Sequence, residues 1–247
     1  MDKLSPDCLD IDAGNTRIKW RLSRGGELLL SGAADGVKTE LRASISPYSA
    51  SIKRCRLSSV AGVVVDADIE SLLKELCGIR VERAASRAVS CGVENTYEPP
   101  ESLGVDRWLA VVAAYSRYGK ACVVVDCGSA ITVDLIDEGG RYLGGYIVPG
   151  LGLMRRALFQ DTDAVKVEPA CVSDLGVGRN TSNAVNHGMY QMIVGLLERA
   201  LAELRGGGQA PLLVLTGGDA LRLKPFLPEA AEFHDGLVFE GLARVLP

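Results

Sequence analysis

The sequence predicts an α/β protein made of two structurally similar halves. Two observations indicate this fold class. A strand, a Gly-containing turn and two further strands occur twice along the chain, and helical patterns separate the strand groups. The two copies are offset by 114 residues, the separation of Asp12 from Asp126. At 247 residues with 47% hydrophobic composition, the chain is long enough to bury a substantial core in one or two domains.

The first half opens with three strand patterns. Leu9–Asp12 is a short apolar run, and residues 18–22 alternate between apolar and charged side chains, so a β-hairpin is expected. A Gly-Gly turn leads to a third strand over Leu28–Leu30. Apolar residues at helical spacing over Ile69–Leu76 then end at Gly78, which predicts an amphipathic helix.

The second half repeats this opening after a helix over residues 105–116. Strands are expected over Ala121–Asp126, Ile131–Ile136, Tyr142–Val148 and Leu212–Leu215, and a long helix over Met189–Leu204 is expected to end at the glycines 206–208. The repeat predicts an N-terminal half at residues 1–110 and a C-terminal half at 111–247.

Charge and hydropathy limit the partners. The formal net charge of −4 leaves no excess of Lys and Arg to replace the counterions of a nucleic acid or an anionic membrane, so neither is expected. Residues 1–6 lack the start of a signal peptide, and no stretch approaches the roughly 18 apolar residues of a membrane helix. The expected compartment is the cytoplasm.

The cysteines carry no metal or disulfide pattern. They are odd in number and contain no C-x-x-C pair, and the only histidines that could join them in a metal site are His187 and His234. Neither a zinc site nor a disulfide framework is therefore expected from this set: Cys8, Cys55, Cys77, Cys91, Cys122, Cys127 and Cys171.

Three motifs follow apolar strands and can bind phosphate. Asp12–Lys19 (DAGNTRIK) and Asp126–Asp134 (DCGSAITVD) each place a carboxylate at a strand end and a glycine where backbone N–H groups can approach a phosphate. Thr216–Asp219 (TGGD) follows a strand and precedes a helix expected to start near Ala220. Alone, the first motif is typical of an ordinary turn and the third of strand-to-helix geometry. All three motifs in this order are a much more specific sign of phosphate binding than any one of them alone.

With these motifs, the chain resembles actin-like ATPases, which have two ribonuclease H-like halves, and among them the type III pantothenate kinases. The sequence Gly104-Val105-Asp106-Arg107 matches the G-x-D-R signature of that family. Tyr97 before the signature, Gly145–Gly150 (GYIVPG) and Gly178–Thr181 (GRNT) are supporting matches, and the resemblance runs from about Leu9 to about Gly241.

The resemblance implies residue roles at the nucleotide. ATP phosphates and Mg²⁺ would be contacted by Asp12, Gly14, Asn15, Thr16 and Lys19, and ATP also by Gly128, Ser129, Gly217 and Gly218. Asp126 would bind a monovalent cation, K⁺ or NH₄⁺. Two positions depart from the family pattern, because Ser129 stands where Thr is usual and Arg17 varies the first motif. Ser keeps the hydroxyl, so ATP binding is expected to persist.

The resemblance also implies an acceptor site for pantothenate, lined by Tyr97, Gly104, Val105, Asp106, Arg107 and Thr181. A hydroxyl that attacks a γ-phosphoryl group needs a positioned carboxylate as proton acceptor, and Asp106 would be this base. From spacing alone, capping of the following helix is an equally good interpretation of Asp106. Arg107 could be a surface charge or a partner of the substrate carboxylate.

The expected function is therefore phosphorylation of pantothenate to 4′-phosphopantothenate, the first step of coenzyme A biosynthesis. Alternatives are another actin-fold small-molecule kinase, or a regulatory protein that binds nucleotide without catalysis. The acceptor signature argues against the first, and retention of Asp12, Asp106 and Asp126 together argues against the second. A homodimer is expected from the resemblance and from the apolar area of the helix at Asn183–Leu204.

Overall fold

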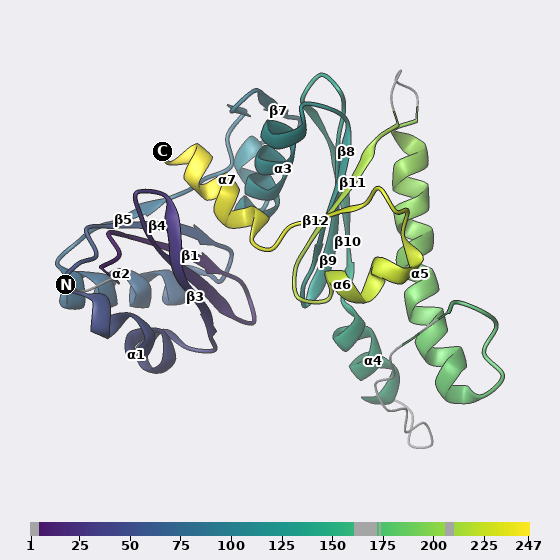
Figure 1. Cartoon of the computed structure of the whole chain (residues 1–247), viewed down its shortest axis with the longest axis horizontal. Coiled ribbons are helices and arrows are strands. Elements are labelled where there is room, and N and C mark those ends of the chain that lie inside the picture. Colours follow the sequence, from purple (N-terminus) through teal and green to yellow (C-terminus); the bar gives the residue numbers. More distant parts are fainter. Residues whose placement is uncertain (1–4, 161–171, 173, 206–209) are drawn as a thin grey trace. The chain divides into compact units, whose positions relative to one another are not determined.

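The computed structural model describes residues 5–160, 172, 174–205 and 210–247. Cys171 and the glycines 206–208 lie outside the described residues. The contacts divide the chain into two compact units (Figure 1). The first comprises Met1–Cys91, Tyr97–Ala113 and Val238–Pro247, and the second comprises Gly92–Thr96 and Ala114–Leu237.

The first unit contains a five-stranded sheet in the order β3-β2-β1-β4-β5. The strands are β1 (Cys8–Ala13), β2 (Ile18–Arg24), β3 (Glu27–Ala34), β4 (Arg54–Ser59) and β5 (Val81–Arg83). β1, β2 and β3 are antiparallel neighbours, whereas β4 and β5 run parallel to β1. The helices are α1 (Arg42–Ile45), α2 (Val63–Cys77), α3 (Val105–Tyr118), which continues into the second unit, and α7 (Leu237–Val245).

Strand alternation builds the core of the first unit. Leu9, Ile11 and Ala13 of β1 are fully buried or nearly so on one face of the sheet, in one cluster with Trp20 of β2 and with apolar residues of α2. α2 ends where expected, at Gly78 in the left-handed conformation (φ +70°). The hairpin and helix predicted from periodicity are therefore confirmed.

The second unit is built on a seven-stranded sheet in the order β12-β11-β8-β9-β10-β7-β6. The strands are β6 (Val89–Ser90), β7 (Val93–Asn95), β8 (Cys122–Cys127), β9 (Ala130–Ile136), β10 (Arg141–Pro149), β11 (Leu212–Thr216) and β12 (Glu232–Phe233). The helices are α4 (Leu151–Gln160), α5 (Thr181–Glu203) and α6 (Ala220–Leu223). The long α5 packs its buried residues against β8 and β9.

The two sheets share one topology, which confirms the predicted fold class. In the first, an antiparallel three-strand meander continues through the parallel strands β4 and β5, and β10-β9-β8-β11-β12 repeats this order with the same strand directions. Asp12 and Asp126 occupy equivalent next-to-last positions of β1 and β8. The two halves expected from the sequence, 1–110 and 111–247, are each one continuous segment. In the structure, Val238–Pro247 at the end of the chain belongs to the first unit.

No helix among the described residues is long and apolar enough to cross a membrane.

Candidate active site

The first phosphate motif is a hairpin at the carboxyl end of β1. The N–H of Gly14 donates to the carbonyl oxygen of Arg17 (3.1 Å), which closes the turn between β1 and β2. Asn15 and Thr16 at the tip are exposed, as is Lys19 on β2, whose Cα pairs with that of Asp12. The hairpin therefore presents backbone and side-chain hydrogen-bond donors to solvent at the carboxyl end of β1.

Asp12 is held by the neighbouring parallel strand. Ser58 of β4 is fully buried and donates its hydroxyl hydrogen to Oδ1 of Asp12 (3.2 Å). The two residues are register partners, so the hydroxyl and carboxylate lie on the same face of the sheet. This bond orients the half-buried Asp12 side chain at the carboxyl end of the parallel strands β1 and β4, the end at which α/β sheets bind ligands.

The segment Gly104–Arg107 lies beyond the same edge of the first sheet. Just after β5, the N–H of Ala84 donates to the carbonyl oxygen of Leu57 in β4 (2.9 Å). Two residues later, Ser86 Oγ donates to the carbonyl oxygen of Leu103 (2.8 Å). Because residues 84–86 continue from the carboxyl end of β5, they attach Gly104–Arg107 to that end of the sheet.

Asp106 lies in the first turn of α3, which begins at Val105. Its Oδ1 accepts a hydrogen bond from the backbone N–H of Arg107 (2.8 Å). A Cβ on Gly104 would lie 2.8 Å from the same oxygen, so the glycine leaves room for the carboxylate. Asp106 is not the N-cap residue, because it is the second residue of the helix. Its carboxylate nevertheless accepts a hydrogen bond from one backbone N–H of the first turn.

Arg107 is not a surface charge, which removes one of its two interpretations. The residue is only 7% exposed, and its Nη1 donates to the hydroxyl of Tyr97 (3.3 Å). The guanidinium carbon also lies 6.0 Å from the centre of the Tyr97 ring. A buried guanidinium is costly unless it is paired, so this arginine and tyrosine form one polar unit beside Asp106.

The second phosphate motif forms the corresponding hairpin of the second unit. The N–H of Gly128 donates to the carbonyl oxygen of Ala130 (3.0 Å), and Ser129 is exposed at the tip. Gly217 approaches this hairpin so closely that a Cβ there would lie 2.5 Å from Oδ1 of Asp126. Its positive φ of 93° also favours glycine. Gly217 therefore lets the loop after β11 close over Asp126, while Gly218 remains exposed.

Gly150 contacts this hairpin, although in the sequence it is marked only by the GYIVPG match to the family. Its N–H donates to the carbonyl oxygen of Ser129 (3.0 Å), and a Cβ would lie 2.4 Å from the carbonyl oxygen of Gly128. The signal available in the sequence was a Pro-Gly pair between a strand and a helix. That signal indicates a turn and gives no information about which distant backbone it touches.

Thr181 is the first residue of α5 and is exposed. The side chain of Asn180 caps this helix, because its Oδ1 accepts from the N–H of Asn183 (2.8 Å). The predicted site residues thus fall into two groups. Asp12, Gly14, Asn15, Thr16, Lys19, Tyr97 and Gly104–Arg107 belong to the first unit, and Asp126, Gly128, Ser129, Gly217, Gly218 and Thr181 to the second.

The described cysteines are free thiols, and burial raises the thiol pKa of five of them: Cys8, Cys55, Cys77, Cys122 and Cys127. Burial raises the pKa of the Cys127 thiol to about 12, with further contributions from Asp126 and Asp219. Cys127 therefore stays protonated beside the second hairpin and offers no nucleophile. His187 hydrogen-bonds through Nδ1 to the carbonyl oxygen of Gly176 (2.6 Å).

The residues present fit a magnesium ion that arrives with a nucleotide. Within the described part of the chain there is no cluster of three or more His, Cys, Asp or Glu that could hold a metal by itself. Mg²⁺ in phosphoryl-transfer sites is commonly bound by one or two carboxylates together with substrate phosphates and water. Asp12, oriented by Ser58 beside the first hairpin, would be such a carboxylate.

Comparison with known proteins decides the family. The sequence profile described as type III pantothenate kinase matches residues 8–203. A type III pantothenate kinase of Alcanivorax borkumensis is 39% identical over 96% of this chain and 97% of its own length. One of Chromohalobacter salexigens is 42% identical over 97% of this chain and 87% of its own length.

The chain belongs to the type III pantothenate kinase family.

Solved structures show that this type III pantothenate kinase family member has the actin-like fold. A Campylobacter jejuni protein described as a Baf family transcriptional activator is 20% identical, with a TM-score of 0.66 over 96% of both chains. A Listeria monocytogenes protein described as an N-acetylmannosamine kinase is 11% identical, with a TM-score of 0.55 over 97% of this chain and 98% of its own. At these identities the likeness concerns the fold alone, and it confirms the predicted class.

Proposed function

We propose that this protein transfers the γ-phosphoryl group of ATP to the primary hydroxyl of pantothenate. The observation that carries the proposal is the Gly104–Arg107 element, which places a carboxylate and a buried guanidinium together at the carboxyl edge of the first sheet. Family membership over nearly the whole chain supports the same activity. The products are 4′-phosphopantothenate and ADP, and the reaction opens coenzyme A biosynthesis.

Asp106 acts as the base in this proposal. As the hydroxyl oxygen of pantothenate bonds to the γ-phosphorus, its O–H bond breaks and the proton passes to the Asp106 carboxylate, while the bond from phosphorus to the β-γ bridging oxygen breaks and ADP leaves. Oδ1 is engaged by the N–H of Arg107, which fixes the orientation of the carboxylate. Oδ2 is then the atom directed to the substrate.

Tyr97 and Arg107 hold the acceptor. The guanidinium can bind the carboxylate of pantothenate as a charge-assisted pair, and its contact with the Tyr97 hydroxyl fixes its direction. Gly104 and Val105 complete the wall beside Asp106, and Thr181 contributes a hydroxyl from the start of α5. Correct placement of the acceptor is the main catalytic effect available to these residues, because phosphoryl transfer depends largely on positioning.

The two hairpins bind ATP. In the first, Gly14, Asn15, Thr16 and Lys19 contact the phosphates, and Asp12 would hold Mg²⁺, which neutralises the charge developing on the phosphoryl oxygens. In the second, Gly128 and Ser129 contact ATP, Asp126 binds K⁺ or NH₄⁺, and Gly217 and Gly218 approach the nucleoside. A homodimer in the cytoplasm completes the proposal.

One coupled assay tests the proposed activity. Purified protein with ATP and Mg²⁺ is given pantothenate, a hexose, N-acetylmannosamine or no acceptor, and ADP formation is followed. We expect ADP release that depends on pantothenate, with mass spectrometry showing one added phosphoryl group on the acceptor. Turnover with a sugar but not with pantothenate would assign the protein to another actin-fold kinase, and no turnover with any acceptor despite ATP binding would favour a regulatory role.

A further inference from the structure

Helix α7 contacts both the sheet of the first unit and helix α3. It is the last helix of the chain and follows strands of the second unit, yet from Val238 onward it belongs to the first unit. Both of its contacts are built from residues with no role in the proposed site. Because β1 carries Asp12 and α3 carries Asp106, α7 touches the helix that holds one of these carboxylates and also β2 and β4, the two strands that pair with the strand holding the other.

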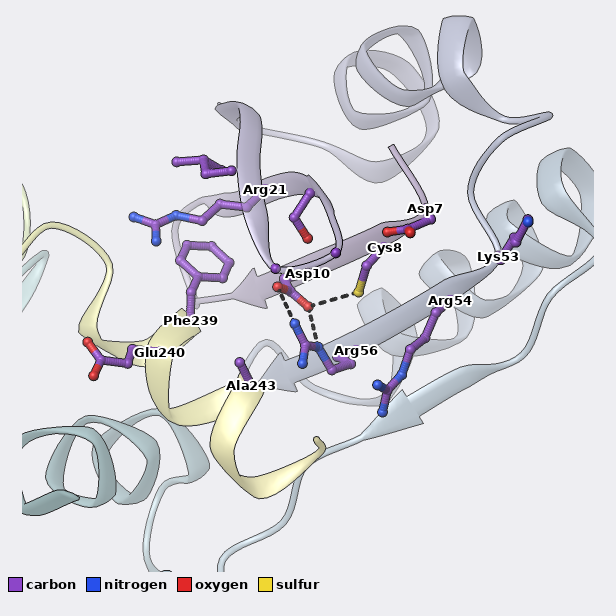
Figure 2. A pocket seen from close by; sticks show the side chains of 14 residues that line it. Asp7, Cys8, Asp10, Arg21, Lys53, Arg54, Arg56, Phe239, Glu240 and Ala243 are labelled. Carbon is purple, nitrogen blue, oxygen red and sulfur yellow. Dashed lines mark hydrogen bonds and ion pairs between the residues drawn. The ribbon is translucent and has the colours of Figure 1, made fainter. Parts of the chain in front are cut away.

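The contact with the sheet is a buried ion pair that also binds the end of α7. Asp10 of β1 accepts two hydrogen bonds from Arg56 of β4, from Nε (2.6 Å) and Nη2 (2.9 Å). Nη1 of Arg56 donates to the carbonyl oxygen of Leu246, directly after α7 (3.0 Å). The Asp10 and Arg56 side chains are only 8% and 11% exposed. Figure 2 shows this pair beside α7.

The beginning of α7 is attached to the same face of the sheet. The Arg21 guanidinium carbon lies 4.6 Å from the centre of the Phe239 ring, and Phe239 is 6% exposed. Asp10 and Arg21 are register partners on β1 and β2, so both α7 contacts come from one row across the sheet. A cavity of about 570 Å³ is lined by residues of the strands and of α7, among them Arg21, Arg56 and Ala243 (Figure 2).

On its other side α7 meets α3 at backbone distance. A Cβ on Gly241 would lie 2.1 Å from the carbonyl oxygen of Leu109 and 2.6 Å from its carbonyl carbon. These are atoms of the α3 backbone, which cannot turn aside as a flexible side chain can. Leu109 is three residues after Asp106, about one helical turn, and is fully buried. Any side chain at 241 must therefore push α7 and α3 apart near the proposed base.

We infer that α7 is a positioning element of the phosphoryl transfer, in which the Asp10–Arg56 pair and Gly241 fix Asp106 relative to Asp12. The inference rests on the proposed function of Asp106. Asp10 precedes Asp12 by two residues on the same strand face, and Gly241 sets the approach of α3. A catalytic group that is misplaced by about 1 Å can lower the rate on the order of 100-fold. A shift of α3, which carries Asp106, should therefore lower kcat more than it weakens ATP binding.

The first test is Gly241→Ala, with Gly195→Ala as its matched control. Gly195 lies in the middle of α5, and a Cβ there meets nothing within 4 Å, so the control makes the same change in a helix without a steric cost. We expect Gly241→Ala to lower kcat for pantothenate at least about 10-fold with the KM for ATP changed less than about 2-fold. Gly195→Ala should match wild type in both constants.

The second test addresses the ion pair. Asp10→Asn removes its charge at nearly constant size, and Asp10→Glu keeps the charge beside a cavity that has room for one more methylene. We expect Asp10→Asn to show the same selective loss of kcat and Asp10→Glu to recover most of it. A purely structural pair would instead lower the melting temperature and leave kcat and both KM values of the folded enzyme unchanged.

Hydrogen exchange separates failure of this inference from failure of the proposed function. Amides of α3 from Asp106 to Val111 should exchange at least about 5-fold faster in Gly241→Ala than in wild type or Gly195→Ala, whether or not pantothenate is the substrate. Faster exchange with normal kcat would refute the link between α7 and catalysis. Wild-type exchange and wild-type kcat in Gly241→Ala would overturn the inference outright, and if that variant fails to fold, the Asp10 series decides.

Discussion

At the scale of single residues, the geometry of Asp106 is compatible both with support of the first turn of α3 and with a role as the base. Its Oδ1 accepts from the Arg107 N–H in the first turn of α3, which stabilises the helix, while Oδ2 makes no hydrogen bond or ion pair within the described parts of the chain. A carboxylate that only capped the helix would need no buried arginine beside it. Arg107 with Tyr97 supplies a recognition element that capping does not require.

Replacement of the proposed base tests this residue directly. Asp106→Asn keeps the size and the hydrogen bond to the helix but removes the proton acceptor, so we expect kcat to fall at least about 100-fold with ATP affinity preserved. Steady-state kinetics and ATP titration measure the two quantities. Asp137→Asn is the control, because Asp137 also accepts from backbone N–H groups, those of Gly139 and Arg141 (both 2.9 Å), in a turn without a proposed role. Near wild-type turnover of Asp106→Asn would reduce Asp106 to a helix cap.

At the scale of elements, the two hairpins have the same main-chain design and different supports. Gly14 and Gly128 each close their turn with a backbone bond, whereas Asp12 is oriented by a serine hydroxyl and Asp126 is covered by Gly217. Lys19 is the only lysine in either motif. A triphosphate bound beside these carboxylates would be repelled unless cations neutralise the charge.

This charge balance predicts dependence on a monovalent cation. At constant ionic strength, activity should rise when Na⁺ is replaced by K⁺ or NH₄⁺, because a cation at Asp126 reduces repulsion of the phosphates. Asp126→Ala should abolish the response and weaken ATP binding by about 10-fold, equivalent to about 1.4 kcal/mol. Titrations of ATP in the two salts provide the measurement. Equal activity in Na⁺ and K⁺, with unchanged ATP affinity in Asp126→Ala, would leave Asp126 as an ordinary turn residue.

At the scale of the whole molecule, exposed apolar side chains gather on elements of the second unit. Ile147 of β10 is 61% exposed, Met192 of α5 59% and Leu153 of α4 42%. The contacts join these elements, because α4 packs on both β10 and α5. Apolar surface of this kind on neighbouring elements is typical of a protein interface. The proposed occupant is a second copy of this chain.

A homodimer is testable by mass and by one charge. Light scattering at micromolar concentration should give about twice the 26.2 kDa chain mass. Met192→Asp should shift the species toward monomer, because a desolvated carboxylate without a partner opposes association. Val64→Asp, at a side chain 73% exposed in the first unit, should leave the mass unchanged. A monomer mass for the unaltered protein would contradict the proposal.

Local patterns predicted much of the fold and the position of the proposed site. The alternation over residues 18–22 indicated β2, helical spacing before Gly78 indicated α2, and both elements are present. Placement of carboxylates after apolar runs put Asp12 and Asp126 at strand ends, where they are found. These predictions succeed because the periods of strands and helices are properties of the backbone and are written in neighbouring residues.

The sequence by itself therefore determined the repeated hairpins and the family signature, whereas the tertiary structure decided which distant residues meet. Nothing near Gly241 in the sequence indicates that it touches Leu109, and nothing near Gly150 indicates the carbonyl oxygen of Gly128. The burial of Arg107 and the pairing of Asp10 with Arg56 were likewise not predictable. Such contacts depend on how complete elements pack, because close approach across a long stretch of chain is set by the shape of both surfaces and leaves no periodic trace in either.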